Sequence, residues 1–293
     1  MNDNIMIGIS NEILSYLTAN DIKYKQGKEA NALPRSIFEL RLLALLNSYF
    51  KLDIARKRTV HFSKELTKSF SNLNENVQNL TISFKNKFES GDPIQYNLST
   101  LAHNSDASDF LFDQWNIKHL HLSNDEATNV SEMKGNRGDW LLFFVDGEDQ
   151  VLFLDVRVHP PTSAGFICFE FLKILESNNW MSAINATYCE KKDIIIEPEW
   201  VVKEGKDADK DAYEFMKGKA NFFMEINRKY YMINPVSIGG KRIAYVDALK
   251  NIERKLEQIP KNSDFIDFRI VLKNGCFGML KYRTDSVDAM LSI

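Results

Sequence analysis

The sequence lacks the features that define several specialised classes of protein. Its 293 residues carry a formal net charge of −3, so the chain as a whole is not a basic nucleic-acid binder, although such a total still allows a local basic patch. No apolar run reaches the roughly 18 residues of a membrane span. The N-terminus, MNDNIMIGISNEIL, has no basic stretch ahead of its apolar residues, which does not fit a signal peptide. We therefore expect a cytoplasmic protein without membrane contact.

Cysteine and familiar cofactor motifs are equally scarce. The three cysteines, Cys168, Cys189 and Cys276, lie far apart without paired spacing, which favours a reduced protein with buried thiols over a disulfide scaffold. Neither a Rossmann fingerprint nor a G-x-S-x-G motif is present, and residues 237–241 lack the spacing of a P-loop. We therefore predict no cofactor.

Apolar residues are plentiful, and in the first third of the chain their spacing is helical. They make up 44% of the sequence, with 20 phenylalanines, which is enough for a sizeable core. Helices are predicted at residues 5–20, 36–50 and 63–87, with Ser63 as the cap of the last. The apolar residues of that helix recur at alternating spacings of four and three: Leu66, Phe70, Leu73, Val77, Leu80 and Phe84. Such a stripe packs either on the core or on a second copy of the chain, so a homodimer through the 63–87 helix is one expectation.

The rest of the chain alternates between β-rich runs and turn residues. Strands or hairpins are predicted at residues 117–122, 140–145, 150–159, 221–233 and 265–282, and helices at residues 166–177 and 245–258. Asn274-Gly275 is a particularly strong hairpin signal, and turns this tight join antiparallel strands. We therefore predict an α+β fold, with a mainly helical region at residues 1–108 followed by an antiparallel-hairpin α+β region at residues 109–293.

One central stretch carries three of the five histidines. His119 and His121 are two residues apart in an apolar run, and Asp155, Arg157 and His159 are spaced by two in another. Successive side chains of a strand point to opposite faces, so each set shares one face of its strand, with buried leucines opposite the first two histidines. If the two faces coincide, one sheet gathers three imidazoles, a guanidinium and a carboxylate. These five residues are our candidate catalytic set.

Three kinds of chemistry fit this set. In the first, His119 or His121 is the general base and His159 the general acid for RNA cleavage. Arg157 then stabilises negative charge on the phosphate. In the second, the three histidines, with or without Asp155, bind a divalent metal. In the third, the histidines only pack and form hydrogen bonds.

We favour the first chemistry, that of an endoribonuclease that binds RNA and needs no metal. Its 2′-hydroxyl nucleophile is supplied by the RNA itself. The alternative is a non-enzymatic sensor or interaction protein with structural histidines. A metal-dependent hydrolase or nuclease is the third hypothesis.

Arg56, Lys57 and Arg58 form the one compact basic run of the sequence. Its simplest interpretation is a solvated surface cluster. Its functional interpretation is contact with the phosphates of a nucleic acid.

Asp109 and Asp113 are four residues apart on the helix predicted before the first histidine strand. The simpler interpretation is a capping or solvated acidic pair. The alternative is that one of them orients an imidazole through a hydrogen bond.

Residues 109–122, DFLFDQWNIKHLHL, resemble a signature of uncharacterised bacterial proteins of mobile elements and phage-defence islands, D-x-x-x-D-x-W-x-I-x-H-L-H-L. The resemblance covers residues 92–159, with a weaker echo at residues 231–256, and this chain has Asn116 where that group is expected to have glycine. The order of helix, histidine strand, long loop and hairpin ending in histidine is also similar to the fold of RelE-like endoribonuclease toxins. The second likeness is one of topology, and fold alone does not imply function. Together they imply a toxin or antiphage effector.

Overall fold

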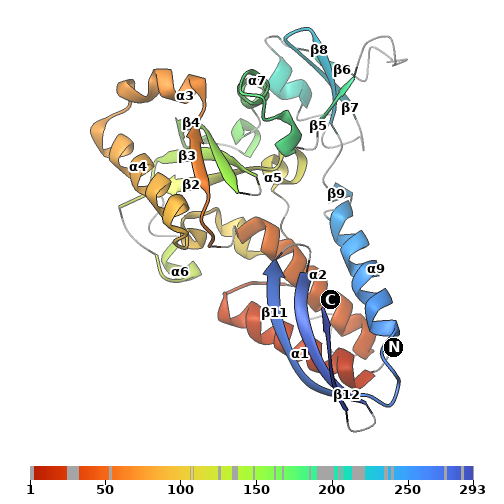
Figure 1. The fold of residues 1–293 in the computed structure, drawn as a ribbon. Coiled ribbons are helices and arrows are strands. Elements are labelled where there is room, and N and C mark those ends of the chain that lie inside the picture. Colours follow the sequence, from red (N-terminus) through yellow and green to blue (C-terminus); the bar gives the residue numbers. More distant parts are fainter. Residues whose placement is uncertain are drawn as a thin grey trace. The chain divides into compact units, whose positions relative to one another are not determined.

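The structure is a computed structural model of the chain, and it describes most of the 293 residues. The described residues are 3–24, 33–52, 55–105, 107, 109–124, 127–133, 138–147, 149–161, 163–166, 168–184, 186–189, 201–203, 205, 207–212, 222–233, 237–238, 241–273, 276–284 and 287–292. The α+β class predicted from the sequence is confirmed (Figure 1). Long helices at the N-terminus and mixed and antiparallel sheets elsewhere make up the fold.

The chain forms two compact units, and both are discontinuous in sequence. The first contains residues 1–52, 101–107 and 240–293, and the second contains residues 53–100 and 108–239. The division at residue 108 that the sequence suggested differs from this arrangement. The reason is that the N-terminal helices bury their apolar faces against C-terminal elements, which no local pattern can reveal.

The first unit combines helices from both ends of the chain with a three-stranded antiparallel sheet. Its elements are α1 (Asp3–Ala19), α2 (Pro34–Leu52), β10 (Lys241–Arg242), α9 (Ile243–Glu257), β11 (Asp264–Lys273), β12 (Cys276–Thr284) and β13 (Val287–Ser292). Helix α1 packs on α2 and on β11, and α2 also contacts α9. The approach of α1 to β11 is close, because a Cβ added at Gly8 would come within 2.4 Å of the Phe265 ring. The predicted helices and hairpin of this unit are confirmed, whereas β13 was not predicted.

The second unit contains two four-stranded sheets and short helices. Its strands are β1 (Thr59–Phe62), β2 (Ile117–Leu122), β3 (Trp140–Asp146), β4 (Gln150–Val158), β5 (Ala186–Cys189), β6 (Val201–Lys203), β7 (Phe222–Ile226), β8 (Lys229–Ile233) and β9 (Ser237–Ile238). Its helices are α3 (Lys64–Ser69), α4 (Glu75–Ser90), α5 (Phe110–Trp115), α6 (Val130–Met133) and α7 (Glu170–Ser177), with 3-10 turns at Phe70–Asn72, Gln95–Asn97, Ser163–Phe166 and Met181–Ile184. A further 3-10 turn, Thr100–His103, contains the boundary in sequence between residue 100 of the second unit and residue 101 of the first.

The first sheet of this unit has the strand order β1-β4-β3-β2. Strands β3 and β4 form the antiparallel hairpin that the sequence predicted, the histidine strand β2 pairs antiparallel with β3, and β1 adds to β4 in parallel. Strand β1 was not predicted, because it is four residues long and its partner lies far along the chain. A single bridge from Leu98 to Leu120 flanks the outer edge of β2.

A β-bulge in β4 decides which side chains face which layer. Phe143 pairs with Asp155 and Phe144 pairs with Phe153, so Leu154 is an extra residue in β4. A bulge of this kind shifts the alternation by one position. As a result, the side chains of Leu154, Asp155 and Arg157 lie on the sheet face that α7 covers. The side chain of Phe153 lies on the opposite face, which α4 covers.

Both faces of the first sheet are covered. On one face, the rings of Phe144 and Phe153 lie 5.2 and 5.4 Å from that of Phe88 in α4. On the other, residues of β2, β3, β4 and α7 share a core with the second sheet, β5-β8-β7-β6. Burial on both sides explains why these strands read as nearly continuous apolar runs.

The predicted helix at residues 63–87 is interrupted. Helix α3 ends at Ser69, a 3-10 turn follows, and the Asn74 side chain accepts a hydrogen bond from the Val77 amide to begin α4. A capping asparagine favours a new helix start over continuation of the old one. Leu66, Val77 and Phe84 are buried inside the unit, so the core accounts for much of the stripe without a second copy of the chain.

Other predicted boundaries are also revised. The helix predicted at residues 166–177 starts only at Glu170, and Phe166 belongs to the preceding 3-10 turn. The sequence also predicts a β-rich run at residues 193–202, which lies mostly outside the described residues. Antiparallel β7 and β8 confirm the hairpin predicted at residues 221–233.

Candidate functional site

Strand β2 presents its two histidines on one face, as the sequence predicted. Leu120 and Leu122 lie on the opposite face and are buried. The histidines are themselves largely covered, with 7% of His119 and 6% of His121 exposed. Edge strand β2 is therefore buried from both sides, which is unusual for a strand that carries polar side chains.

The three candidate histidines form one cluster. The ring centroid of His121 lies 5.8 Å from that of His119 and 5.5 Å from that of His159, with an angle of 28° between the rings of the second pair. Phe166 closes the group, because its ring lies 4.9 Å from that of His119 and 5.3 Å from that of His159. The two histidine segments therefore meet on one face of the sheet.

The register of the sheet accounts for this meeting. His119 pairs with Phe143, which pairs with Asp155, and His121 pairs with Leu141, which pairs with Arg157. Strands β2 and β4 are thus separated only by β3, at about 10 Å. The bulge brings the β4 residues to the face that the histidines share. All five candidate residues lie on this face.

His159 follows the last residue of β4 and is half-buried. Its backbone N–H donates to the Asp139 carbonyl at 2.7 Å, and its ring Nδ1 lies 2.8 Å from the Pro160 carbonyl oxygen. A carbonyl oxygen only accepts hydrogen bonds, so Nδ1 carries the proton. In the neutral ring this leaves the lone pair on Nε2.

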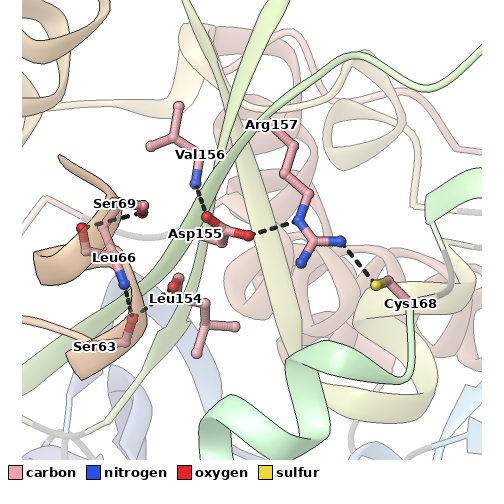
Figure 2. A network of polar contacts seen from close by, with 8 residues as sticks. All are labelled: Ser63, Leu66, Ser69, Leu154, Asp155, Val156, Arg157 and Cys168. Atoms are coloured by element: carbon pink, nitrogen blue, oxygen red, sulfur yellow. Dashed lines mark hydrogen bonds and ion pairs between the residues drawn. The ribbon is translucent and has the colours of Figure 1, made fainter. Parts of the chain in front are cut away.

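Arg157 is held on two sides (Figure 2). Its Nε donates to Asp155 Oδ2 at 2.6 Å and its Nη1 to Cys168 Sγ at 2.8 Å. The guanidinium also lies 4.6 Å from the centre of the Phe171 ring of α7. Burial lowers the pKa of Arg157, but the charge interactions and hydrogen bonds with Cys168 and Asp155 outweigh it and raise the pKa above its ordinary value. The side chain is a fixed positive charge.

Cys168 is the residue of this network that sequence reasoning missed. It lies between the 3-10 turn Ser163–Phe166 and α7, and it is half-buried. Arg157 lies on β4 and Cys168 lies eleven residues further along, outside that strand, so no period of a single helix or strand predicts the contact.

The acidic pair on α5 has a capping role. The Asp109 side chain accepts from the Phe112 amide, and the Asp113 side chain accepts from the Asp109 amide at 3.0 Å. The two carboxylates therefore satisfy reciprocal donors at the start of α5, in the manner of a capping box. This confirms the simpler of the two sequence interpretations.

The basic run does not form one surface patch. Arg58 has a side chain that is 1% exposed, lies 3.1 Å from Asp146 and stacks 4.5 Å from the centre of the Phe88 ring. Arg56 also pairs with Asp146, at 2.9 Å, while Lys57 is exposed. The prediction that Arg58 binds nucleic acid is therefore wrong, because its side chain is buried. Arg56 and Lys57 keep an accessible position.

Two further properties concern only the part of the chain that the structure describes. Within it, no three or more histidine, cysteine, aspartate or glutamate side chains are grouped in a way that could hold a metal ion. Within the same residues, no helix has the length and apolar character needed to cross a membrane.

Comparison with models of protein families, with curated proteins and with solved structures finds no match for this chain. The resemblances to mobile-element proteins and to RelE-like toxins stay predictions. Function must therefore be argued from the site itself.

Proposed function

We propose that the protein is a cytoplasmic, metal-independent endoribonuclease of the toxin or antiphage-effector kind. One observation carries the proposal: the rings of His121 and His159 face each other at 5.5 Å on the sheet face that also holds a fixed guanidinium. A pair of imidazoles beside a permanent positive charge is the equipment that cleavage of a phosphodiester requires without a metal.

His159 is assigned the role of general base. Its Nδ1–H is engaged by the Pro160 carbonyl, so Nε2 is the atom that accepts a proton. It is also the only half-buried member of the cluster, and substrate therefore approaches from its side. This assignment exchanges the acid and base roles that the sequence suggested, because the sequence does not show which ring nitrogen of His159 is engaged by a carbonyl.

His121 is assigned the role of general acid. In the proposed reaction, His159 takes the proton of the ribose 2′-hydroxyl, and the 2′-oxygen attacks the adjacent phosphorus. The bond from phosphorus to the 5′-oxygen breaks, and protonated His121 donates its proton to that oxygen. The products are a 2′,3′-cyclic phosphate and a 5′-hydroxyl, and no redox change or metal is involved.

Arg157 stabilises the negative charge that develops on the non-bridging oxygens. Two of its nitrogens are engaged by Asp155 and Cys168, which fixes the plane of the guanidinium and leaves Nη2 for the phosphate. Asp155 is a positioning residue in this scheme. A lysine at position 157 would keep the charge but lose the planar fork.

His119 is assigned a positioning role. Its ring lies 4.9 Å from that of Phe166 and 5.9 Å from that of Phe143, so it is packed among aromatic side chains. From there it supports the ring of His121 in an edge-on contact. Its replacement is expected to lower activity less than replacement of His121 or His159.

The chemistry is tested with two RNA substrates in excess EDTA. One is a short single-stranded RNA, and the other has a single 2′-deoxynucleotide at each position where the first is cut. We expect cleavage of the first to a 2′,3′-cyclic phosphate and no cleavage of the second at the modified positions. Equal cleavage of both substrates, or loss of activity in EDTA, would overturn the mechanism, and the latter result would favour a metal-dependent nuclease.

The non-enzymatic hypothesis has one observation in its favour. His119 and His121 are more than nine-tenths buried, as structural histidines are. Absence of cleavage of both RNA and DNA by the wild-type protein would select a sensor or interaction protein.

A further inference from the structure

A groove lined by both polar and apolar side chains lies apart from the histidine cluster, in the second unit. It consists of two adjoining cavities of about 420 and 290 Å³. The two cavities share Lys87 and Asn97 as lining residues, so they lie next to each other. Its walls are α4, the 3-10 turn Gln95–Asn97 and the chain that follows β2. The larger cavity is within the size range of small-molecule and nucleotide sites.

The groove combines neutral hydrogen-bonding groups with the apolar side chains of Leu80, Phe84 and Pro93. Side chains of Asn79, Ser83 and Asn97 line it and make no hydrogen bond to any other described residue. Its charged lining residues are Lys87 and Asp92, so its formal charge is zero. Amide groups offer a donor and an acceptor side by side, which matches the edges of nucleobases. Tyr96 adds an aromatic ring of the kind on which bases stack.

The groove adjoins the outer edge of the strand that carries the candidate acid, although its α4 wall covers the sheet face opposite the histidines. The bridge between Leu98 and Leu120 is antiparallel, so Asn97 lies on the side of the bridge toward His121. Neighbouring strands are about 5 Å apart, so the wall of the groove is one strand away from the backbone of the histidine strand. Ser123 and Asn124, which directly follow β2, line the groove as well.

We propose that this groove binds a nucleotide of single-stranded RNA and so sets the base preference of the enzyme. This inference rests on the proposed function, because the location beside β2 is what selects RNA over another polar ligand such as an oligosaccharide. The base is held by amide side chains, and its phosphates stay in solvent, since the groove has no net positive charge. A duplex does not bind, because its base edges are already paired.

Binding is measured by fluorescence anisotropy with a labelled short single-stranded RNA and the full-length His159→Ala protein, which does not cut the probe. In that background, Asn79→Asp adds a negative charge to the groove wall with little change of shape. The matched control is Asn86→Asp, the same change on α4 but about 10 Å further along the helix and outside the groove lining. We expect Asn79→Asp to weaken binding about five- to tenfold and Asn86→Asp to weaken it less than twofold at 0.15 M salt.

A second pair of variants tests occupation of the groove by volume. Ser83→Trp fills the smaller cavity, whereas Ile82→Trp places the same ring on an exposed part of α4 that does not line it. We expect Ser83→Trp to abolish binding of the single strand and to change which bases are cut in the active protein. Circular dichroism and thermal unfolding confirm that each variant is folded.

The outcomes separate this inference from the proposed function. If wild type cleaves RNA and the groove variants bind and cut like their controls, the groove inference is wrong and the function stands. If the groove variants weaken RNA binding but wild type cleaves nothing, the groove is an RNA-binding site, and both the proposed function and the role in base preference are wrong. Binding of a neutral oligosaccharide in place of RNA, unaffected by Asn79→Asp, would also overturn the inference.

Discussion

The imidazoles of His121 and His159 lie 5.5 Å apart although their strands, β2 and β4, are not neighbours in the sheet. Strand β3 separates them, and the two side chains reach each other across it. The extra residue Leu154 in β4 brings Arg157 and its neighbours to the face of the histidines. The candidate site therefore depends on the bulge, and the first predictions concern the contacts that hold it.

Ser63 joins the bulge to the start of α3. Its hydroxyl donates to the Leu154 carbonyl at 2.7 Å and accepts from the Leu66 amide at 2.8 Å (Figure 2). We expect Ser63→Ala to lower the free energy of unfolding by about 1–3 kcal/mol, because it removes a helix cap and leaves a buried carbonyl without its donor. Urea unfolding measures the change. The exposed Ser71→Ala is the control, and equal stability of the two variants would contradict this role for Ser63.

Gly138 allows the chain to pass close to the end of β2. A Cβ at this position would come within 1.9 Å of the Leu122 carbonyl oxygen. Gly138→Ala is therefore expected to cost about 1–3 kcal/mol, as other overpacked sites do. Gly205→Ala is the matched control, since a Cβ there meets nothing within 4 Å. Thermal unfolding compares the two variants. Equal melting temperatures would contradict the prediction, because they would show that the backbone at residue 138 moves to accommodate the Cβ without cost.

Arg58 is expected to serve stability. Arg58→Met removes a buried partner of Asp146 and should destabilise the protein by about 2–4 kcal/mol. The loss is not larger because Arg56 still offsets part of the carboxylate charge. Lys57→Met, at an exposed position of the same basic run, should change stability by less than about 0.5 kcal/mol. Chemical denaturation compares the two. A stable Arg58→Met variant would contradict the structural role.

Glu65 links α3 to the end of α7 and gives stability a dependence on pH. Burial raises its pKa, but hydrogen bonds from Ser177 and Asn178 lower it more, so the pKa lies below its ordinary value of 4.5. A carboxylate with a depressed pKa stabilises the fold above its ordinary pKa and loses this contribution as the pH falls through the lowered value.

We therefore expect the stability of Glu65→Gln to fall less steeply than that of wild type as the pH drops below about 4.5. Denaturant midpoints measured across that range give the comparison. Parallel pH profiles of the two proteins would contradict the assigned hydrogen bonds.

Local signals in the sequence were sufficient for much of the fold. Period-two spacing identified β2 and the side on which its histidines lie, and tight turns identified the hairpins β3–β4, β7–β8 and β11–β12. These features depend only on residues a few positions apart. The spacing of Asp155, Arg157 and His159 likewise predicted a shared face.

Features that depend on distant partners were missed. Packing between segments that are remote in sequence causes three of them. These are the parallel pairing of β1 with β4, the bulge at Leu154 and the contact of β11 with α1. The charge of Arg58 did not indicate that its side chain is buried, because its partner Asp146 lies on β3, far along the chain. The break of the 63–87 helix had a local cause, the cap at Asn74, which a continuous apolar stripe concealed.

In the proposed reaction, His121 and His159 cleave RNA as an acid and base pair. The most direct measurement is the initial rate of cleavage of a short single-stranded RNA in excess EDTA by wild type, His121→Ala and His159→Ala. His61→Ala, an exposed histidine on β1 outside the cluster, is the control. We expect a loss of about 10²-fold or more for each cluster variant and an unchanged rate for the control. Cleavage by His121→Ala or His159→Ala at the wild-type rate, or none by wild type, would contradict it.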